Sequence, residues 1–406
     1  MSFQNDDAPL LSSSEQKDEG AQKKRKIIAI SVLSVVVIVT IISAVMNFGD
    51  DYVSSTQQQL KAYLVDAEGI YCNDGTQPGF YFSASVNDAS SGDWVVLLPG
   101  GHFCWDNDSC ESRALTENKY WTGPTEGDLK DGVGILSAIE DENPDLFEAN
   151  HVELVYCSSD SWLGDKTYGP EDNMFTDNMY FQGGPMATAI LTDLLENYGM
   201  AEANNVVLAG ASAAGIAMLS RFEELKQQIL DVNPAIKVTA MLDGPWYLYD
   251  RAYEGYEQNS TAECGWLYDW IDPIDYLHPG CVASETDDVA CFFGNEVWPY
   301  ISAEAKDDMF LAQQMFDVAH NDGEGFRELN TEAAEDITDP YPYEGAEIYA
   351  EQLAEAVNGI QLIYICVVSH CLILFLFPSL LAFHHRCNRL TQILSCICVC
   401  SVCIKL

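Results

Sequence analysis

The sequence predicts an α/β fold with a mostly parallel sheet that is covered by helices on both faces. Two observations support this. Short apolar runs alternate with longer amphipathic stretches, and residues able to do chemistry follow several of the apolar runs. Strands buried on both faces read as continuous apolar runs, and sites in such sheets form where the strands end. The expected strands are 94–98, 152–156, 206–208, 238–242 and 309–312, and the expected helices are 186–197 and 216–230.

A tight turn around Ser212 is the first chemical feature. In VVLAGASAAG an expected strand ends, small residues surround one hydroxyl, and an expected helix follows. A serine attacks esters when a strand-to-helix turn holds it exposed beside a base and beside backbone N–H groups that bind an oxyanion. The pattern is G-x-S-x-A-G, with Ala214 where glycine is usual and Gly215 one residue later. The turn favours a nucleophile, although a plain tight turn with an incidental serine has the same small residues.

A second glycine-rich turn follows the expected strand 94–98. The stretch LLPGGHFCWDNDSC leads from this strand into Gly100, Gly101 and His102. Two glycines allow the backbone to turn its N–H groups toward a ligand, as in the oxyanion loops of esterases. Together with the N–H of Ala213, this turn supplies the donors of an oxyanion hole. The alternative is a plain glycine turn.

The charge balance excludes several classes of partner. The 406 residues include 63 acidic and 19 basic residues, for a formal net charge of −44, and 48% of them are hydrophobic. This composition is ample for a buried core, but it argues against binding to nucleic acids or to anionic lipid surfaces. It also favours neutral esters over polyanionic polymers, although solubility in a salty or acidic medium explains the charge equally well.

An N-terminal membrane anchor is expected at residues 27–48. This apolar run is long enough to cross a bilayer, and four basic residues at 23–26 precede it. The basic flank predicts a single-pass type II protein with a luminal or extracellular domain, or a secreted one if the anchor is cleaved. The expected organisation is a cytosolic tail at 1–26, the anchor at 27–48, a stem at 49–60, an α/β domain at 61–361 and an apolar, cysteine-rich tail at 362–406.

An oxidising compartment makes disulfides the expected state of the cysteines in the domain. Two glycosylation sequons begin at Asn107 and Asn259. The number of domain cysteines is odd, so one thiol is left over or pairs with Cys366 or Cys371. The disulfide candidates are Cys72, Cys104, Cys110, Cys157, Cys264, Cys281 and Cys291.

The C-terminal tail differs in composition from the acidic domain. Residues 362–383 are almost continuously apolar, and a basic, cysteine-rich stretch follows them. The tail is long enough for a second membrane span. Palmitoylation and a translated intron in a faulty gene model are the alternatives.

Six unusual motifs occur in order along the chain: GGHFCWDNDSCESR, GVGILS, VYCSSDSWLGD, AGASAAG, CFFGNEVWP and QQMFDVAH. Together they resemble the Notum and pectin acetylesterase family, and most closely its Notum-like carboxylesterases. The resemblance covers about residues 60–360. It implies an α/β-hydrolase fold and carboxylic-ester hydrolysis without a metal or other cofactor. It also implies Ser212 as the nucleophile and Gly101, His102 and Ala213 at the oxyanion hole, with His102 where the family commonly has tryptophan.

The same resemblance implies the other two members of a Ser-His-Asp triad. Asp317, in QQMFDVAH, matches the acid of the family and the chain order serine, aspartate, histidine. Asp243, after the strand at 238–242, is the reserve candidate. His370, in ICVVSHC, is the expected base, although the neighbouring cysteine is displaced by one position. His320 lies three residues from Asp317 and is expected to line the site or lie on a loop.

The leading functional hypothesis is a serine carboxylesterase that acts on acetyl groups of a polysaccharide or on a fatty acyl group of a protein. A histidine inside a true membrane span would not reach a luminal site, so a genuine second span favours an inactive ester-binding or adhesion protein instead. A thioesterase or peptidase on the same fold is a third alternative. The messenger sequence across residues 355–406 discriminates, because a splice donor near Gln361 would identify the tail as an artefact.

Overall fold

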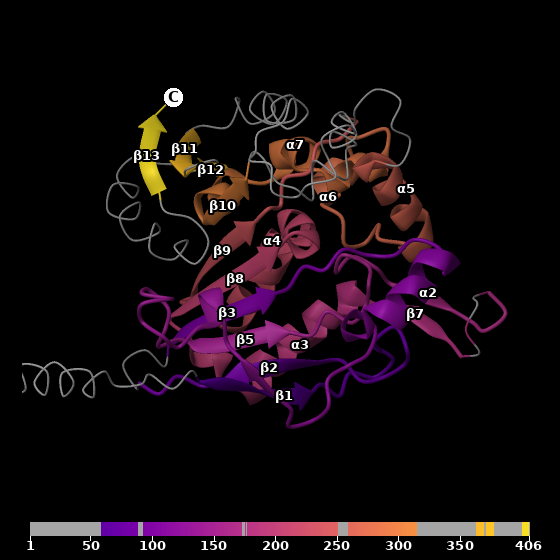
Figure 1. The fold of residues 1–406 in the computed structure, drawn as a ribbon, viewed down its shortest axis with the longest axis horizontal. Helices are drawn as coiled ribbons and strands as arrows, with labels where there is room; N and C mark the ends of the chain where they lie inside the picture. The colour runs from indigo at the N-terminus through magenta and orange to yellow at the C-terminus, as the bar shows by residue number, and fades with distance from the viewer. Residues whose placement is uncertain are drawn as a thin grey trace, which may run out of the picture. The chain divides into compact units, whose positions relative to one another are not determined.

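A mixed sheet lies at the centre of the fold (Figure 1). The structure is a computed structural model that describes residues 58–87, 92–172, 175, 177–250, 259–314, 363–368, 371–376 and 400–405. Within these residues the sheet has eleven strands, in the order β13-β11-β12-β10-β9-β8-β3-β5-β2-β1-β4. The strands are β1 (Gln59–Leu64), β2 (Gly79–Ser83), β3 (Asp93–Leu98), β4 (Leu129–Asp131), β5 (Asn150–Leu154), β8 (Asn205–Ala211), β9 (Lys237–Asp243), β10 (Met309–Gln314), β11 (Ile363–Val368), β12 (Cys371–Leu376) and β13 (Cys400–Lys405). A separate pair joins β6 (Lys166–Tyr168) to β7 (Met179–Phe181).

The central strands of the sheet are parallel. Strands β5, β3, β8, β9 and β10 pair in parallel, and each overlaps one of the five strands expected from the sequence. Antiparallel strands flank this core on both sides. The register places Ala211, Asp243 and Ala312 at one level, so β8, β9 and β10 end along the same edge of the sheet. The predicted parallel sheet is confirmed for the central strands.

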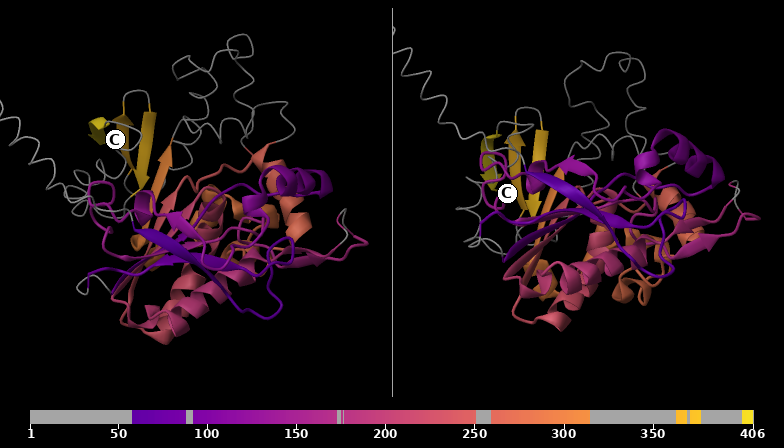
Figure 2. Two further views of the ribbon diagram at one scale, coloured as in Figure 1. Left: turned by 60° about the horizontal axis from the view of Figure 1, so that its bottom comes forward. Right: turned by 90° about the horizontal axis from the view of Figure 1, so that it is seen from below.

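The long helices α3 and α4 pack side by side on one face of the sheet (Figure 2). They include both helices expected from the sequence. On the opposite face, Val95 of β3 packs with Leu60 and Leu136. Among the described residues, a short 3₁₀ turn therefore covers this part of the sheet in place of a long helix. The helices are α2 (Asn107–Thr116), α3 (Gly183–Asn197), α4 (Ala213–Val232), α5 (Ser260–Ile271), α6 (Pro279–Val282), α7 (Gly294–Val297) and α8 (Ala303–Asp307). The 3₁₀ turns are η1 (Asn118–Tyr120), η2 (Gly134–Leu136), η3 (Met200–Glu202), η4 (Asp288–Phe292) and η5 (Trp298–Tyr300).

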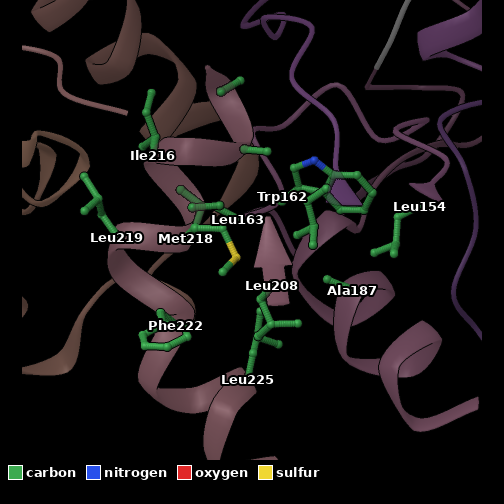
Figure 3. Packing of buried hydrophobic residues seen from close by; sticks show 14 of the residues in the cluster. Leu154, Trp162, Leu163, Ala187, Leu208, Ile216, Met218, Leu219, Phe222 and Leu225 are labelled. Atoms are coloured by element: carbon green, nitrogen blue, oxygen red, sulfur yellow. The ribbon is translucent and has the colours of Figure 1, made fainter. Parts of the chain in front are cut away.

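Helix α4 forms because its apolar side chains recur with helical spacing along one side. Met218 and Leu225 point toward Leu208 of β8 (Figure 3), and these three side chains and that of Phe222 are buried. Burying each of these side chains contributes roughly 1.5–3 kcal/mol. This packing fixes the axis of α4 relative to β8, and therefore fixes the turn between them.

Six of the seven domain cysteines form three disulfides, which confirms that prediction for these six. The seventh, Cys264, is buried in α5 and lies outside the three pairs. Asn107 begins α2, and the side chain of Asn259 caps α5 by accepting a hydrogen bond from the backbone N–H of Ala262 at 3.0 Å. The pairs are Cys72–Cys157, Cys104–Cys110 and Cys281–Cys291.

The expected anchor at 27–48 lies outside the described residues. No helix in the described part of the chain is long and apolar enough to span a membrane. Two stretches of the C-terminal tail, 363–368 and 371–376, are the antiparallel strands β11 and β12, and β12 continues the sheet next to β10. The expectations for the anchor and for the nature of the tail remain predictions.

Candidate active site

Ser212 occupies the turn between β8 and α4. Its backbone has φ 52° and ψ −120°, a conformation that non-glycine residues rarely adopt. Two hydrogen bonds hold it there: the Ser212 N–H donates to the Asp243 carbonyl at 2.8 Å, and the Ser212 carbonyl accepts from the Ile216 N–H at 3.1 Å. The half-buried side chain places its Oγ 3.4 Å from the hydroxyl of Tyr247. Backbone strain of this kind persists only where the surrounding structure imposes it, and it concentrates at functional sites.

The positions of the glycines explain the unusual G-x-S-x-A-G pattern. A Cβ on Gly215 would lie 2.9 Å from Pro245, and a Cβ on Gly210 would lie 2.7 Å from Met218. Both contacts are too close for a side chain. Ala214 is fully buried and its methyl group is accommodated. The turn therefore needs glycine at position 215, because Pro245, in the segment that follows β9, lies against it. It tolerates alanine at position 214.

The loop of Gly100, Gly101 and His102 lies directly against this turn. A Cβ on Gly100 would overlap the Ala211 carbonyl oxygen and lie 2.9 Å from the Cβ of Ser212. Gly101 and His102 both have positive φ, 147° and 58°. The two loops that the sequence assigns to one oxyanion hole are therefore in contact, while the oxyanion hole itself stays a prediction.

Ala213, the first residue of α4, provides the other side of the site. The first N–H groups of a helix have no partner within the helix, and the helix dipole makes this end favourable for negative charge. Ser212 therefore lies between the start of α4 and the loop at Gly100, an arrangement suited to binding an anion that develops on the group attacked.

A buried hydrogen-bond network supports the loop from behind. Arg113 of α2 donates from Nη2 to the Gly101 carbonyl at 2.6 Å and from Nε to Ser159 Oγ at 2.8 Å. The Tyr156 hydroxyl donates to the His102 carbonyl at 2.7 Å. Sequence reasoning did not identify Arg113 or Tyr156, because their contacts join segments that are distant along the chain. Both residues do lie in motifs of the family resemblance, Arg113 at the end of GGHFCWDNDSCESR and Tyr156 in VYCSSDSWLGD, and these motifs were the available signal.

Comparison with known families matches residues 53–334 to pectinacetylesterase. The chain belongs to the pectinacetylesterase family. The human palmitoleoyl-protein carboxylesterase NOTUM is 30% identical to it over 279 residues, which are 66% of this chain and 53% of the human protein. The Drosophila melanogaster counterpart is 30% identical over 268 residues, which are 64% of this chain and 38% of that protein. The chain spans about half the length of the vertebrate relatives it matches.

A solved structure described as the Wnt deacylase Notum from Drosophila has the same fold. It superimposes with a TM-score of 0.64 at 25% identity, covering 74% of this chain and 82% of that chain. This member of the pectinacetylesterase family therefore has a Notum-like α/β-hydrolase fold with a mostly parallel central sheet. The family prediction from the sequence motifs is confirmed.

Aromatic side chains flank the Gly100–Gly101–His102 loop of this pectinacetylesterase-family chain. The His102 ring lies 4.6 Å from Phe103 and 5.8 Å from Trp105, measured between ring centroids. Trp105 in turn lies 5.8 Å from Trp266 of α5, which is 41% exposed. His102 Nε2 is 3.9 Å from a carboxylate oxygen of Glu263. These rings form an aromatic cluster next to the Gly100–Gly101–His102 loop.

The structure brings together the predicted residues Ser212, Gly101, His102 and Ala213. Asp317, His320 and His370 lie outside the described residues. The reserve candidate Asp243 ends β9, and its carbonyl oxygen accepts the Ser212 N–H, so Asp243 supports the turn through its main chain.

Asp160 is a fully buried carboxyl group in the turn behind the site. One oxygen accepts hydrogen bonds from Ser158 Oγ at 2.7 Å and from the Trp162 N–H at 3.0 Å. The other oxygen accepts from the Gly183 N–H, at the start of α3, at 2.6 Å. Burial raises the pKa of Asp160 to about 7. The hydrogen bonds lower this pKa, but their effect is smaller than that of burial.

The raised pKa of Asp160 predicts a pH-dependent contribution to stability. The folded protein holds this proton more tightly than the unfolded chain, whose aspartates titrate near 3.8. The contribution of Asp160 to the free energy of unfolding is therefore greatest below pH 3.8 and falls as the pH rises to about 7. We expect the unfolding free energy of the wild type minus that of Asp160→Asn, both measured by urea denaturation, to fall as the pH rises over this range. A difference that stays constant with pH would contradict the raised pKa.

Proposed function

We propose that the protein is a serine carboxylesterase that hydrolyses O-acyl esters. The observation that carries this proposal is the strained conformation of Ser212, held between the first turn of α4 and the Gly100–Gly101–His102 loop. Membership of the pectinacetylesterase family supports it. The Ser212 hydroxyl attacks the ester carbonyl, and N–H groups of the loop and of Ala213 bind the oxyanion. The alcohol leaves, and water then hydrolyses the acyl-enzyme.

In this proposal His370 is the general base and Asp317 orients it. The register of the described strands supports these assignments. Gln314, the last residue of β10, pairs with Ile373 of β12. Because β12 runs antiparallel to β10, its first residue, Cys371, lies just beyond the end of β10, at the sheet edge where β8 also ends. His370 directly precedes Cys371, and Asp317 follows Gln314 by three residues. Both chain segments thus lead to or from the sheet edge that carries Ser212.

The proposed substrates are acetyl esters of a polysaccharide or a fatty acyl ester of a protein. The family description names pectin acetyl esters, whereas the human relative is named a palmitoleoyl-protein carboxylesterase. The formal net charge of −44 favours the protein ester over anionic pectin, because like charges repel. The aromatic side chains of Trp105 and Trp266 offer apolar surface next to His102 of the loop.

Hydrolysis of p-nitrophenyl acetate and p-nitrophenyl octanoate tests this function. We expect both to be cleaved, and the ratio of their kcat/KM values reports the size of the acyl pocket. His370→Ala and Asp317→Asn should each lower kcat by about 10³-fold or more if they belong to a triad. A folded protein that cleaves neither ester would instead support the inactive, ester-binding alternative.

We also propose a type II topology with the anchor at 27–48 and the domain in the lumen or outside the cell. The three disulfides support it, because disulfides persist in oxidising compartments. The sequons at Asn107 and Asn259 are consistent with it. In microsomes, we expect the domain to resist added protease and to lose mass on treatment with peptide N-glycosidase. Digestion of the domain without a mass change would contradict this topology.

A further inference from the structure

We propose that Arg113 and Tyr156 are positioning residues of the oxyanion hole, and that Ser161 connects Tyr156 to the first turn of α4. Three segments that are distant along the chain form one hydrogen-bonded clamp behind the nucleophile. This inference rests on the proposed function, because it concerns the donors that would bind the oxyanion. None of the three side chains is proposed to touch the substrate.

The clamp sets the direction of the N–H groups through their carbonyl partners. In a trans peptide the C=O and N–H groups point in opposite directions. The Gly101 carbonyl and the His102 N–H belong to one peptide unit, so the bond from Arg113 to this carbonyl turns the N–H of His102 away from Arg113. The Tyr156 hydroxyl fixes the next peptide unit in the same way, through the His102 carbonyl. Since His102 has a positive φ of 58°, which non-glycine residues rarely adopt, this part of the loop needs external support.

The tyrosine also links the loop to the helix that follows the nucleophile. The Tyr156 hydroxyl accepts a hydrogen bond from the Ser161 N–H at 2.7 Å. The Ser161 hydroxyl donates to the carbonyl of Ala213, in the first turn of α4, at 2.6 Å. A continuous chain of hydrogen bonds therefore runs from the His102 carbonyl through Tyr156 and Ser161 to Ala213. The two sides of the oxyanion hole are held at a fixed separation by the same buried groups.

The turn that carries Ser161 has backbone angles that non-glycine residues rarely adopt. Ser159, Ser161 and Trp162 all have positive φ, between 51° and 60°. The buried carboxyl of Asp160 accepts bonds that hold this conformation. Burial raises the pKa of Tyr156, so its hydroxyl stays protonated and remains a donor. Arg113 is only 5% exposed, and its guanidinium lies 4.6 Å from the ring centroid of Tyr120.

Tyr156→Phe tests the clamp, because it removes one hydroxyl and keeps the ring. The matched control is Tyr168→Phe, which removes a hydroxyl that donates to the Trp270 carbonyl at 2.6 Å in another part of the domain. Positioning predicts that Tyr156→Phe lowers kcat by about 10- to 100-fold with KM within about twofold, since an oxyanion hole acts in the transition state. The affinity for a trifluoromethyl ketone that forms a tetrahedral adduct should fall by the same factor. The control should stay within about twofold of the wild type.

A second readout needs no activity. Hydrogen exchange should accelerate in Tyr156→Phe in both the 99–106 and 209–218 segments, and in neither segment in the control. If Tyr156→Phe folds poorly, Ser161→Gly serves instead, because glycine accepts the positive φ and removes the hydroxyl. Unchanged exchange and a kcat within twofold of the wild type would overturn the clamp. An inactive wild type with accelerated exchange in the variant would overturn the proposed function and leave the clamp standing.

Discussion

Replacing Ser212 with alanine is expected to abolish hydrolysis of p-nitrophenyl acetate and octanoate. The change removes only Oγ, which lies 3.4 Å from the Tyr247 hydroxyl, so the turn and its two backbone hydrogen bonds should remain. Loss of a nucleophile that acts with a base and an acid typically lowers kcat by on the order of 10⁴- to 10⁶-fold. The measurement is kcat at saturating ester, with the folded state checked by thermal unfolding.

Ser112→Ala is the matched control for Ser212→Ala. Ser112 is an exposed serine on α2, and its replacement should leave kcat within about twofold of the wild type. Comparable activity in Ser212→Ala and the wild type would assign the esterase chemistry, if any, to another residue.

Replacing Gly100 with alanine is expected to have the second largest effect. The new Cβ would overlap the Ala211 carbonyl and approach the Cβ of Ser212 to 2.9 Å. Neither neighbour is the end of a flexible side chain, so the loop itself must move away from the nucleophile. Misplacing an oxyanion donor costs about 3–4 kcal/mol, or about 10²- to 10³-fold in kcat. Steady-state kinetics should show this loss mainly in kcat.

Gly265→Ala is the control for Gly100→Ala. Gly265 lies within α5, no atom lies within 4 Å of the Cβ it would gain, and alanine is the better helix former by about 1 kcal/mol. This variant should be as active as the wild type and at least as stable. Full activity in Gly100→Ala would show that the loop tolerates displacement and that it does not supply an oxyanion donor.

The central part of the fold could be predicted from the sequence because its pattern is local. The strands at 206–208 and 238–242 are short apolar runs, and the helix at 216–230 follows a turn of small residues. The antiparallel strands β1 and β4 were not predicted. In β1 the buried residues are Leu60 and Ala62, which alternate with exposed polar residues over only four positions, and β4 is three residues long. Such segments become strands through their neighbours in the sheet and carry little signal of their own.

The candidate site likewise has a part that the sequence could predict and a part that it could not. Ser212 and the Gly100–Gly101–His102 loop carry local signals, because a turn that needs glycine or a positive φ restricts the residues at that position. The contacts of Arg113 with Gly101 and of Tyr156 with His102 span 12 and 54 residues. No local pattern marks an arginine or a tyrosine as the partner of a particular carbonyl, so these residues could be identified only from the structure.

Covalent trapping tests the central claim, that Ser212 is the nucleophile of an ester hydrolase, most directly. The folded protein is treated with a fluorophosphonate, digested and analysed by mass spectrometry. The expected result is one adduct, on the peptide that contains Ser212, formed at a rate that rises as a basic group loses its proton. Protection by a slowly hydrolysed ester should slow the labelling. Continued ester hydrolysis after treatment with no adduct on Ser212, or an adduct on a different serine that abolishes activity, would contradict the assignment.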